Sequence, residues 1–208
     1  MKRIPHILIA LRRDTRGSAL VEMAMIIPLL LVFLFAIIDY GRLYWNETAL
    51  QKAMHLAART AAVRTPVCGG VPATIPAAGG TTARFGTPCR TGGACGTIAN
   101  QTCALTAGTT VGAEIWNRIR FLLPPGATAA NVQLTYSFDG RIGFMGGPYS
   151  PIVTAEFVNM NFDFVLPIAP LLALAANDPT IIATSPTSIT LPTMSTSMPG
   201  EDLAVGTN

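Results

Sequence analysis

The sequence predicts an α+β protein in which a single long N-terminal helix packs on a small antiparallel β-sheet domain. Three observations support this fold class. The first 64 residues hold an apolar run followed by an amphipathic one, residues 113–192 hold a short helical pattern and alternating segments, and a loop region with four cysteines lies between. Of the 208 residues, 50% are hydrophobic and only 12% are charged, a balance that is typical of membrane proteins.

Basic residues are concentrated at the N-terminus. Five basic residues against one acidic residue give residues 1–17 a charge of +4, whereas the rest of the chain has 9 basic and 10 acidic residues. Binding to nucleic acid needs Lys and Arg spread over a folded surface, so we expect no nucleic-acid partner. A basic leader before an apolar segment is instead a topology signal that keeps the N-terminus in the cytoplasm.

The apolar run at residues 19–38 contains a single charged residue, Glu22. At 1.5 Å per residue this run is about 30 Å long, so residues 18–38 are expected to form one transmembrane helix. A removable secretory signal is the alternative interpretation, but no small-residue cleavage site follows the run. Pro28 lies inside the run, where proline is compatible with plain packing and with a functional bend.

A carboxylate within this apolar run needs an explanation. Exposing an ionised Glu22 to lipid would cost on the order of 2 to 3 kcal/mol. The alternative is that Glu22 is protonated, points to the lipid headgroups and has no functional role. Glu22 is the fifth residue counted from Ser18, and Gly17 ends the basic leader. Since acids inside membrane helices are functional by default, this position predicts a role for Glu22.

A short basic leader that ends in glycine, followed by four residues and then a glutamate in an apolar helix, resembles the class III signal of type IV pilin-like proteins. The stretch "RGSALVEMAMIIPLLLVFLFAIIDYGRLYWNETALQKAMHLAARTAAVR" is similar to TadE-like pseudopilins of the tight-adherence (Flp) pilus system. The resemblance implies a pilin-like shape and cleavage by a prepilin peptidase between Gly17 and Ser18. It also implies that Glu22 pairs with the new amine of Ser18, or with that of a neighbouring pilin or pseudopilin subunit, during assembly.

The location implied is the inner (cytoplasmic) membrane, crossed once, with the C-terminal domain in the periplasm or outside the cell. Two other functions stay open: an uncleaved signal-anchored periplasmic scaffold, and an exported ligand-binding module. A ligand site would need clustered aromatic residues, and the candidates are Tyr136, Phe138, Phe144 and Tyr149. The sequence has no catalytic motif of the common hydrolase, metalloprotease or nucleotide-binding kinds, so we expect no enzyme and no cofactor.

The helical pattern continues after the apolar run but becomes amphipathic. At 100° per residue, one side of residues 39–64 collects apolar residues: Leu43, Leu50, Met54, Ala57 and Ala61. The opposite side collects polar residues: Thr48, Lys52, His55 and Arg59. We expect the helix to end near Arg64, because Thr65 precedes a proline and is biased out of the helical conformation.

Residues 65–112 form a loop region that is rich in Gly, Thr, Ala and Pro. The region contains all four cysteines of the chain: Cys68, Cys89, Cys95 and Cys103. An even number of cysteines on the exported side of a membrane favours two disulfides. Zinc is the alternative, but no CxxC pair occurs and no histidine lies among the cysteines, so we expect no metal.

The remaining segments complete the predicted domain. Residues 113–126 have apolar residues at helical spacing and should form a short helix. Residues 131–138, 151–166 and 180–191 alternate β-branched or aromatic residues with polar ones, which predicts antiparallel strands within residues 113–192. The apolar segment 167–176 is too short to span a bilayer and should rest on the core or the membrane surface. Residues 193–208 are expected to be a loose tail.

Overall fold

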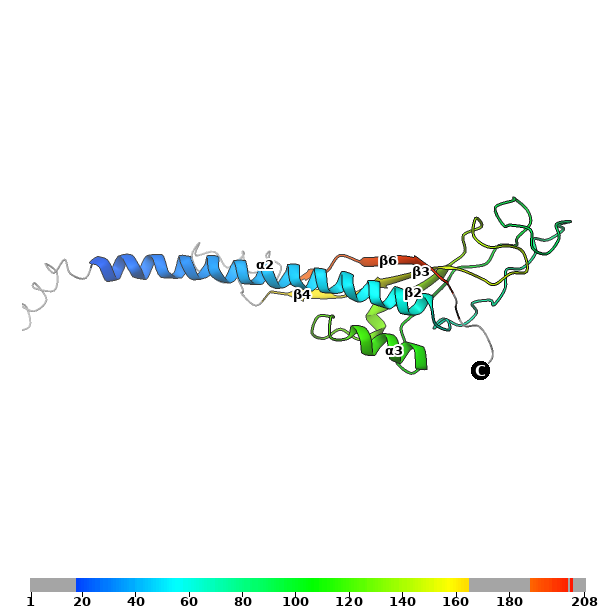
Figure 1. Ribbon diagram of the computed structural model, residues 1–208. Helices are drawn as coiled ribbons and strands as arrows, with labels where there is room; N and C mark the ends of the chain where they lie inside the picture. The colour runs from blue at the N-terminus through cyan, green and yellow to red at the C-terminus, as the bar shows by residue number, and fades with distance from the viewer. Residues whose placement is uncertain (1–17, 165–187, 202, 204–208) are drawn as a thin grey trace, which may run out of the picture. The chain divides into compact units, whose positions relative to one another are not determined.

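The computed structural model describes residues 18–164, 188–201 and 203 (Figure 1). The chain divides into two compact units, one with residues 1–42 and 164–187 and the other with residues 43–163 and 188–208. Helix α2 (Ser18–Ala62) begins in the first unit and ends in the second. The leader at 1–17, the apolar segment 167–176 and most of the expected strand at 180–191 lie outside the described residues.

Within the second unit, α2 is amphipathic as the sequence predicts. Leu50, Ala53, Met54, Ala57 and Ala61 are fully buried, whereas polar residues such as Lys52, His55 and Arg59 are exposed. Most of the buried side chains are small, which lets the helix backbone approach its partner closely. The helix ends at Ala62, two residues before the predicted end, where the Val63 amide donates to the Thr60 carbonyl in a tighter final turn.

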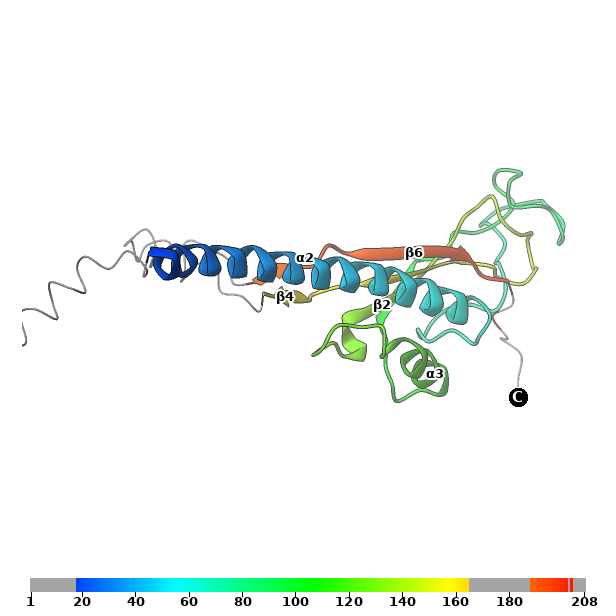
Figure 2. The same cartoon turned by 60° about the vertical axis from the view of Figure 1, so that its left-hand side comes forward.

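The buried side of α2 faces a four-stranded antiparallel sheet in the order β1-β2-β3-β6. Its strands are β1 (Gln101–Ala104), β2 (Val132–Ser137), β3 (Ile152–Phe157) and β6 (Met194–Pro199). Figures 1 and 2 both show β2 and β6 alongside the C-terminal half of α2. Alternate residues of the two central strands are buried: Val132, Leu134, Tyr136, Val153, Ala155 and Phe157. The core of the domain therefore lies between one face of the sheet and the helix.

A short helix, α3 (Thr110–Ile119), follows β1 and buries Ile115 and Ile119. It begins three residues earlier than predicted because Thr109 caps it: the Gly112 amide donates to the Thr109 hydroxyl at 3.1 Å. It also ends earlier than the predicted residue 126, and a one-turn 3-10 helix, η2 (Ala129–Asn131), leads into β2. The predicted helix at 113–126 is therefore confirmed, but its predicted boundaries lie too far toward the C-terminus.

The predicted strand at residues 151–166 is two strands, which corrects the prediction. β3 ends at Phe157 and β4 (Asn161–Asp163) begins after a turn in which Asn159 has a φ of 57°. A left-handed residue cannot continue an extended strand, and asparagine tolerates that conformation better than most residues. β4 pairs with β5 (Ser188–Thr190), the described part of the expected last strand.

The expectation of a loose tail from residue 193 is wrong for β6, and residues 65–112 are not all loop. β6 pairs with β3 along six residues, with Met194 opposite Phe157 and Met198 opposite Val153. Its methionines and Thr196 turn to the half-buried side, while the serines between them are exposed. β1 pairs with β2 at the other edge of the sheet. Both edge strands consist mainly of small or polar residues, so a partner strand rather than their own hydrophobicity holds them in place.

Candidate functional site: the N-terminal helix and its junction with the domain

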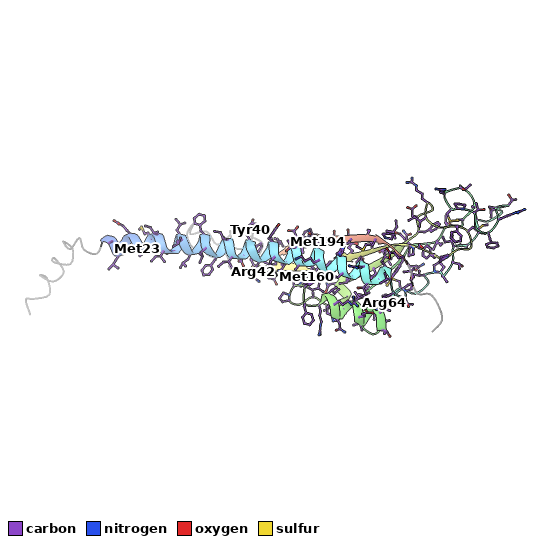
Figure 3. All side chains as sticks on the ribbon, in the orientation of Figure 1. Met23, Tyr40, Arg42, Arg64, Met160 and Met194 are labelled. Carbon is purple, nitrogen blue, oxygen red and sulfur yellow. A yellow bond between two sulfur atoms is a disulfide. The ribbon has the colours of Figure 1, made fainter. Side chains whose placement is uncertain are left out.

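The residues proposed for processing and assembly lie at the start of α2. Gly17 lies outside the described residues, and Ser18 is the first residue of the helix. Glu22 follows one turn later and is exposed. Met23, the next residue, marks this end of α2 in Figure 3, where its side chain points away from the helix. In the described part of the chain Glu22 has no ion-pair partner, so its position is open to a cation from elsewhere.

The next four turns of α2 expose almost every apolar side chain. Leu20 and Met25 are each 75% exposed, and Ile37 is 71% exposed. An uninterrupted apolar surface of this size on all sides of a helix is stable only against lipid or other apolar helices. This is the one described helix that is long and apolar enough to cross a membrane, and none of its most apolar stretch is buried by the residues that the structure describes. The chain thus has the features of a single-pass membrane protein.

An ion pair follows the apolar stretch, and sequence reasoning missed its importance. Asp39 and Arg42 lie one turn apart, and the Arg42 Nη1 atom donates to Asp39 Oδ1 at 2.9 Å. The Asp39 side chain is only 5% exposed, so its charge needs this partner. The signal in the sequence was the spacing of opposite charges by three residues, which predicts contact on a helix. Figure 3 labels Arg42 on α2.

Two contacts anchor the C-terminal end of α2 and the chain just after it. The Arg64 Nη2 atom lies 3.1 Å from Glu114 Oε1 of α3, and Arg118 binds the same oxygen at 2.7 Å. The Val67 amide donates to the hydroxyl of Tyr136 on β2 at 3.2 Å. Burial raises the pKa of Tyr136 above its usual value of 10.0, although the hydrogen bond from Val67 favours the ionised form. Neither contact was predicted.

The four cysteines form two disulfides, as expected. Cys68 pairs with Cys103 across a sequence separation of 35 residues, and Cys89 pairs with Cys95 across 6 residues. The first bond joins the chain just beyond α2 to the edge strand β1, whereas the second closes a small loop. Because all four sulfur atoms are used in these bonds, the zinc interpretation of the cysteines is not supported.

The four aromatic residues considered for a ligand site do not form one. Tyr136 is fully buried on the covered face of β2, and Tyr149 is 4% exposed within a small loop core. Phe138 packs against Tyr149 with ring centroids 6.1 Å apart, while Phe144 is exposed. Burial raises the pKa of Tyr149, whose hydroxyl has no hydrogen-bond partner among the described residues. Three of the four residues therefore serve packing.

The chain thus has an exposed apolar helix that follows Gly17 and carries one acid, Glu22, near its start. Residues 17–59 match the family model described as TadE-like protein. The N-terminal segment is TadE-like. The resemblance inferred from the sequence is thereby confirmed, and the match begins at Gly17 and includes both the exposed apolar half of α2 and most of its amphipathic half.

The TadE-like segment covers about a fifth of the chain, so the sheet and both disulfides lie beyond it. No curated protein and no solved structure matches the chain. The TadE-like match suggests a role in a tight-adherence (Flp) pilus system.

Proposed function

We propose that the chain is a TadE-like pseudopilin that takes part in the biogenesis of a tight-adherence pilus and is cut by a prepilin peptidase after Gly17. The observation that carries the proposal is the family match, which begins at that glycine and follows the exposed apolar helix. The role is structural rather than enzymatic. The domain stays on the outer side of the inner membrane, because the basic leader holds the N-terminus in the cytoplasm.

Cleavage between Gly17 and Ser18 would remove the basic leader and leave a free amine on Ser18. Glu22 lies four residues on, on the same side of the helix and about 6 Å further along its axis. The next described cation along α2 is Arg42, 20 residues away, or about 30 Å at 1.5 Å per residue, and it is already paired with Asp39. A nearby amine is therefore the natural partner of Glu22, either in the same subunit or in a neighbouring one.

The first experiment determines the N-terminus of the protein isolated from cells that contain an active prepilin peptidase. The expected result is a mature chain that begins at Ser18. Gly17→Leu should block the cut, since a bulky side chain would hinder an extended backbone in a narrow cleft. A chain that keeps Met1 under these conditions, with the enzyme shown to cut another pilin, would contradict the proposal and favour the uncleaved scaffold.

The second experiment replaces Glu22 by leucine in the native context and scores processing by gel shift and piliation by the yield of sheared fibres. Insertion and cleavage should persist, because the leader and Gly17 are unchanged. Fibre yield should fall at least tenfold, because the Ser18 amine would enter an apolar contact without a counter-charge. Met23→Leu, one residue along, is the matched control and should assemble normally. Normal fibre yield from Glu22→Leu would remove the assembly role.

A further inference from the structure

The domain ends in a small lobe that the proposed function does not use. This distal lobe consists of residues 66–98 and 139–149, and Figures 1 and 2 show its loops beyond the C-terminal end of α2. Backbone hydrogen bonds join the two segments, among them Ile75 N–H to the Gly147 carbonyl at 2.9 Å and Cys89 N–H to the Gly143 carbonyl at 3.1 Å. The Cys89–Cys95 disulfide closes one of its loops, so a covalent bond and backbone hydrogen bonds hold the lobe together although it lacks regular strands.

Two phenylalanine side chains are exposed on this lobe. Phe85 is 82% exposed and Phe144 is 46% exposed. The rings rest on consecutive glycines, Phe85 against Gly146 and Phe144 against Gly147, at distances that leave no room for a Cβ atom. Gly146 also has a φ of 78°, which disfavours any larger residue. The two glycines thus leave space for the two rings, each of which exposes apolar area to water.

The charge of the lobe is almost entirely positive. Arg84, Arg90 and Arg141 are exposed, and none has an ion-pair partner among the residues that the structure describes. The single acid in the two segments is Asp139, which accepts a hydrogen bond from the backbone amide of Arg141. All three cations are arginines, whose planar guanidinium group matches phosphate oxygens in a two-point contact.

We propose that the distal lobe docks on an anionic phospholipid surface, with Phe85 and Phe144 entering the interfacial region and the three arginines binding headgroup phosphates. Phe85 lies in a turn and Phe144 lies in an isolated bridge opposite Pro88, and both side chains are open to solvent, as residues that enter the interfacial region of a bilayer need to be. The surrounding Gly, Thr, Ala and Pro residues carry no charge that would resist the approach. The proposal is independent of the pilus role.

The test uses the full chain in nanodiscs of pure phosphatidylcholine, which accommodate the apolar half of α2. These discs are mixed with vesicles of phosphatidylcholine alone or with 30% phosphatidylglycerol, and co-flotation is measured. Phe85→Ser/Phe144→Ser should weaken binding to the anionic vesicles at least tenfold. The triple change of Arg84, Arg90 and Arg141 to Gln should weaken it about a hundredfold, at about fivefold for each charge. Raising the salt concentration should have a similar effect.

Phe121→Ser is the matched control, because Phe121 is 78% exposed and lies beside Arg120 but outside the lobe. It should bind like the native chain. Each variant is checked for four unreactive cysteines, and Phe85→Ser alone replaces the double variant if the latter fails this check. Failure of the native chain to float with anionic vesicles, or equal binding by the native and lobe variants, would overturn the proposal. Phe85-dependent binding of polygalacturonate, without vesicle binding, would overturn it in favour of an acidic glycan.

Discussion

The bond between Cys68 and Cys103 should contribute more to stability than any other single cross-link in the domain. Cys68 follows the end of α2 by six residues, and Cys103 lies in the edge strand β1. The perturbation is the double change Cys68→Ala/Cys103→Ala, which removes the cross-link and leaves no unpaired thiol. The matched control is Cys89→Ala/Cys95→Ala, which removes the other disulfide in the same way.

The sizes of the two closed loops set the expected magnitudes. A cross-link restricts the unfolded chain by an entropy that grows with the logarithm of loop length. With a sequence separation of 35 residues, the Cys68–Cys103 bond should contribute about 3.8 kcal/mol at 25 °C. The separation of 6 residues between Cys89 and Cys95 gives about 2.2 kcal/mol. The first double variant should therefore lower the free energy of unfolding by about 1.6 kcal/mol more than the second.

The assay is urea unfolding of the full chain in detergent micelles, followed by the fluorescence of its two tryptophans, Trp45 on α2 and Trp116 on α3. The midpoints and slopes of both double variants are compared with those of the native chain under non-reducing conditions. A free energy of unfolding that falls equally in the two variants, or further in Cys89→Ala/Cys95→Ala, would refute the loop-length argument. It would mean that the Cys68–Cys103 bond contributes no more to the free energy of unfolding than the short-range Cys89–Cys95 bond.

Three further predictions concern the packing of the same domain. Tyr136→Phe should lower the free energy of unfolding by about 1 to 2 kcal/mol in urea titrations, because the Val67 amide loses its acceptor. Burial holds the pKa of Tyr136 above 10.0 in the folded state. The contribution of this group to the free energy of unfolding should therefore be fully present below pH 10 and should be lost as the pH rises through the higher pKa of the folded state. Tyr136→Phe should reduce this loss of stability at alkaline pH. Gly112→Ala should lower the thermal midpoint more than Thr109→Ala, whose cost is about 1 kcal/mol, because a Cβ at position 112 would lie 2.6 Å from the Thr109 hydroxyl; equal midpoints would contradict this.

Features with a local cause were predictable from the sequence. The two halves of α2 follow from a continuous apolar run and then a helical period, and β2 and β3 follow from alternation of apolar and polar residues. The position of Glu22 relative to Gly17 was also visible, because only spacing along the chain defines it. These patterns needed no knowledge of distant segments.

Features with a distant cause were not predictable. The segment "MSTSMP" has no strand pattern of its own strength, and it forms β6 because β3 offers a row of backbone groups. Four cysteines allow three pairings, and only the fold brings Cys68 next to Cys103. The contact between Val67 and Tyr136 joins residues 69 positions apart, which spacing alone cannot indicate.

The Cys68–Cys103 bond also has a mechanical consequence. A pulling force applied along α2 is transmitted from Ala62, the last residue of the helix, to Cys68, six residues further along the chain. The disulfide then transmits the force directly to Cys103 in β1. The intervening loop, across a separation of 35 residues, carries no tension while the bond is intact. Reduction would release that hidden length, about 120 Å of extended chain at roughly 3.4 Å per residue. The oxidised domain therefore yields under force only when the sheet itself separates, and the reduced one stretches first.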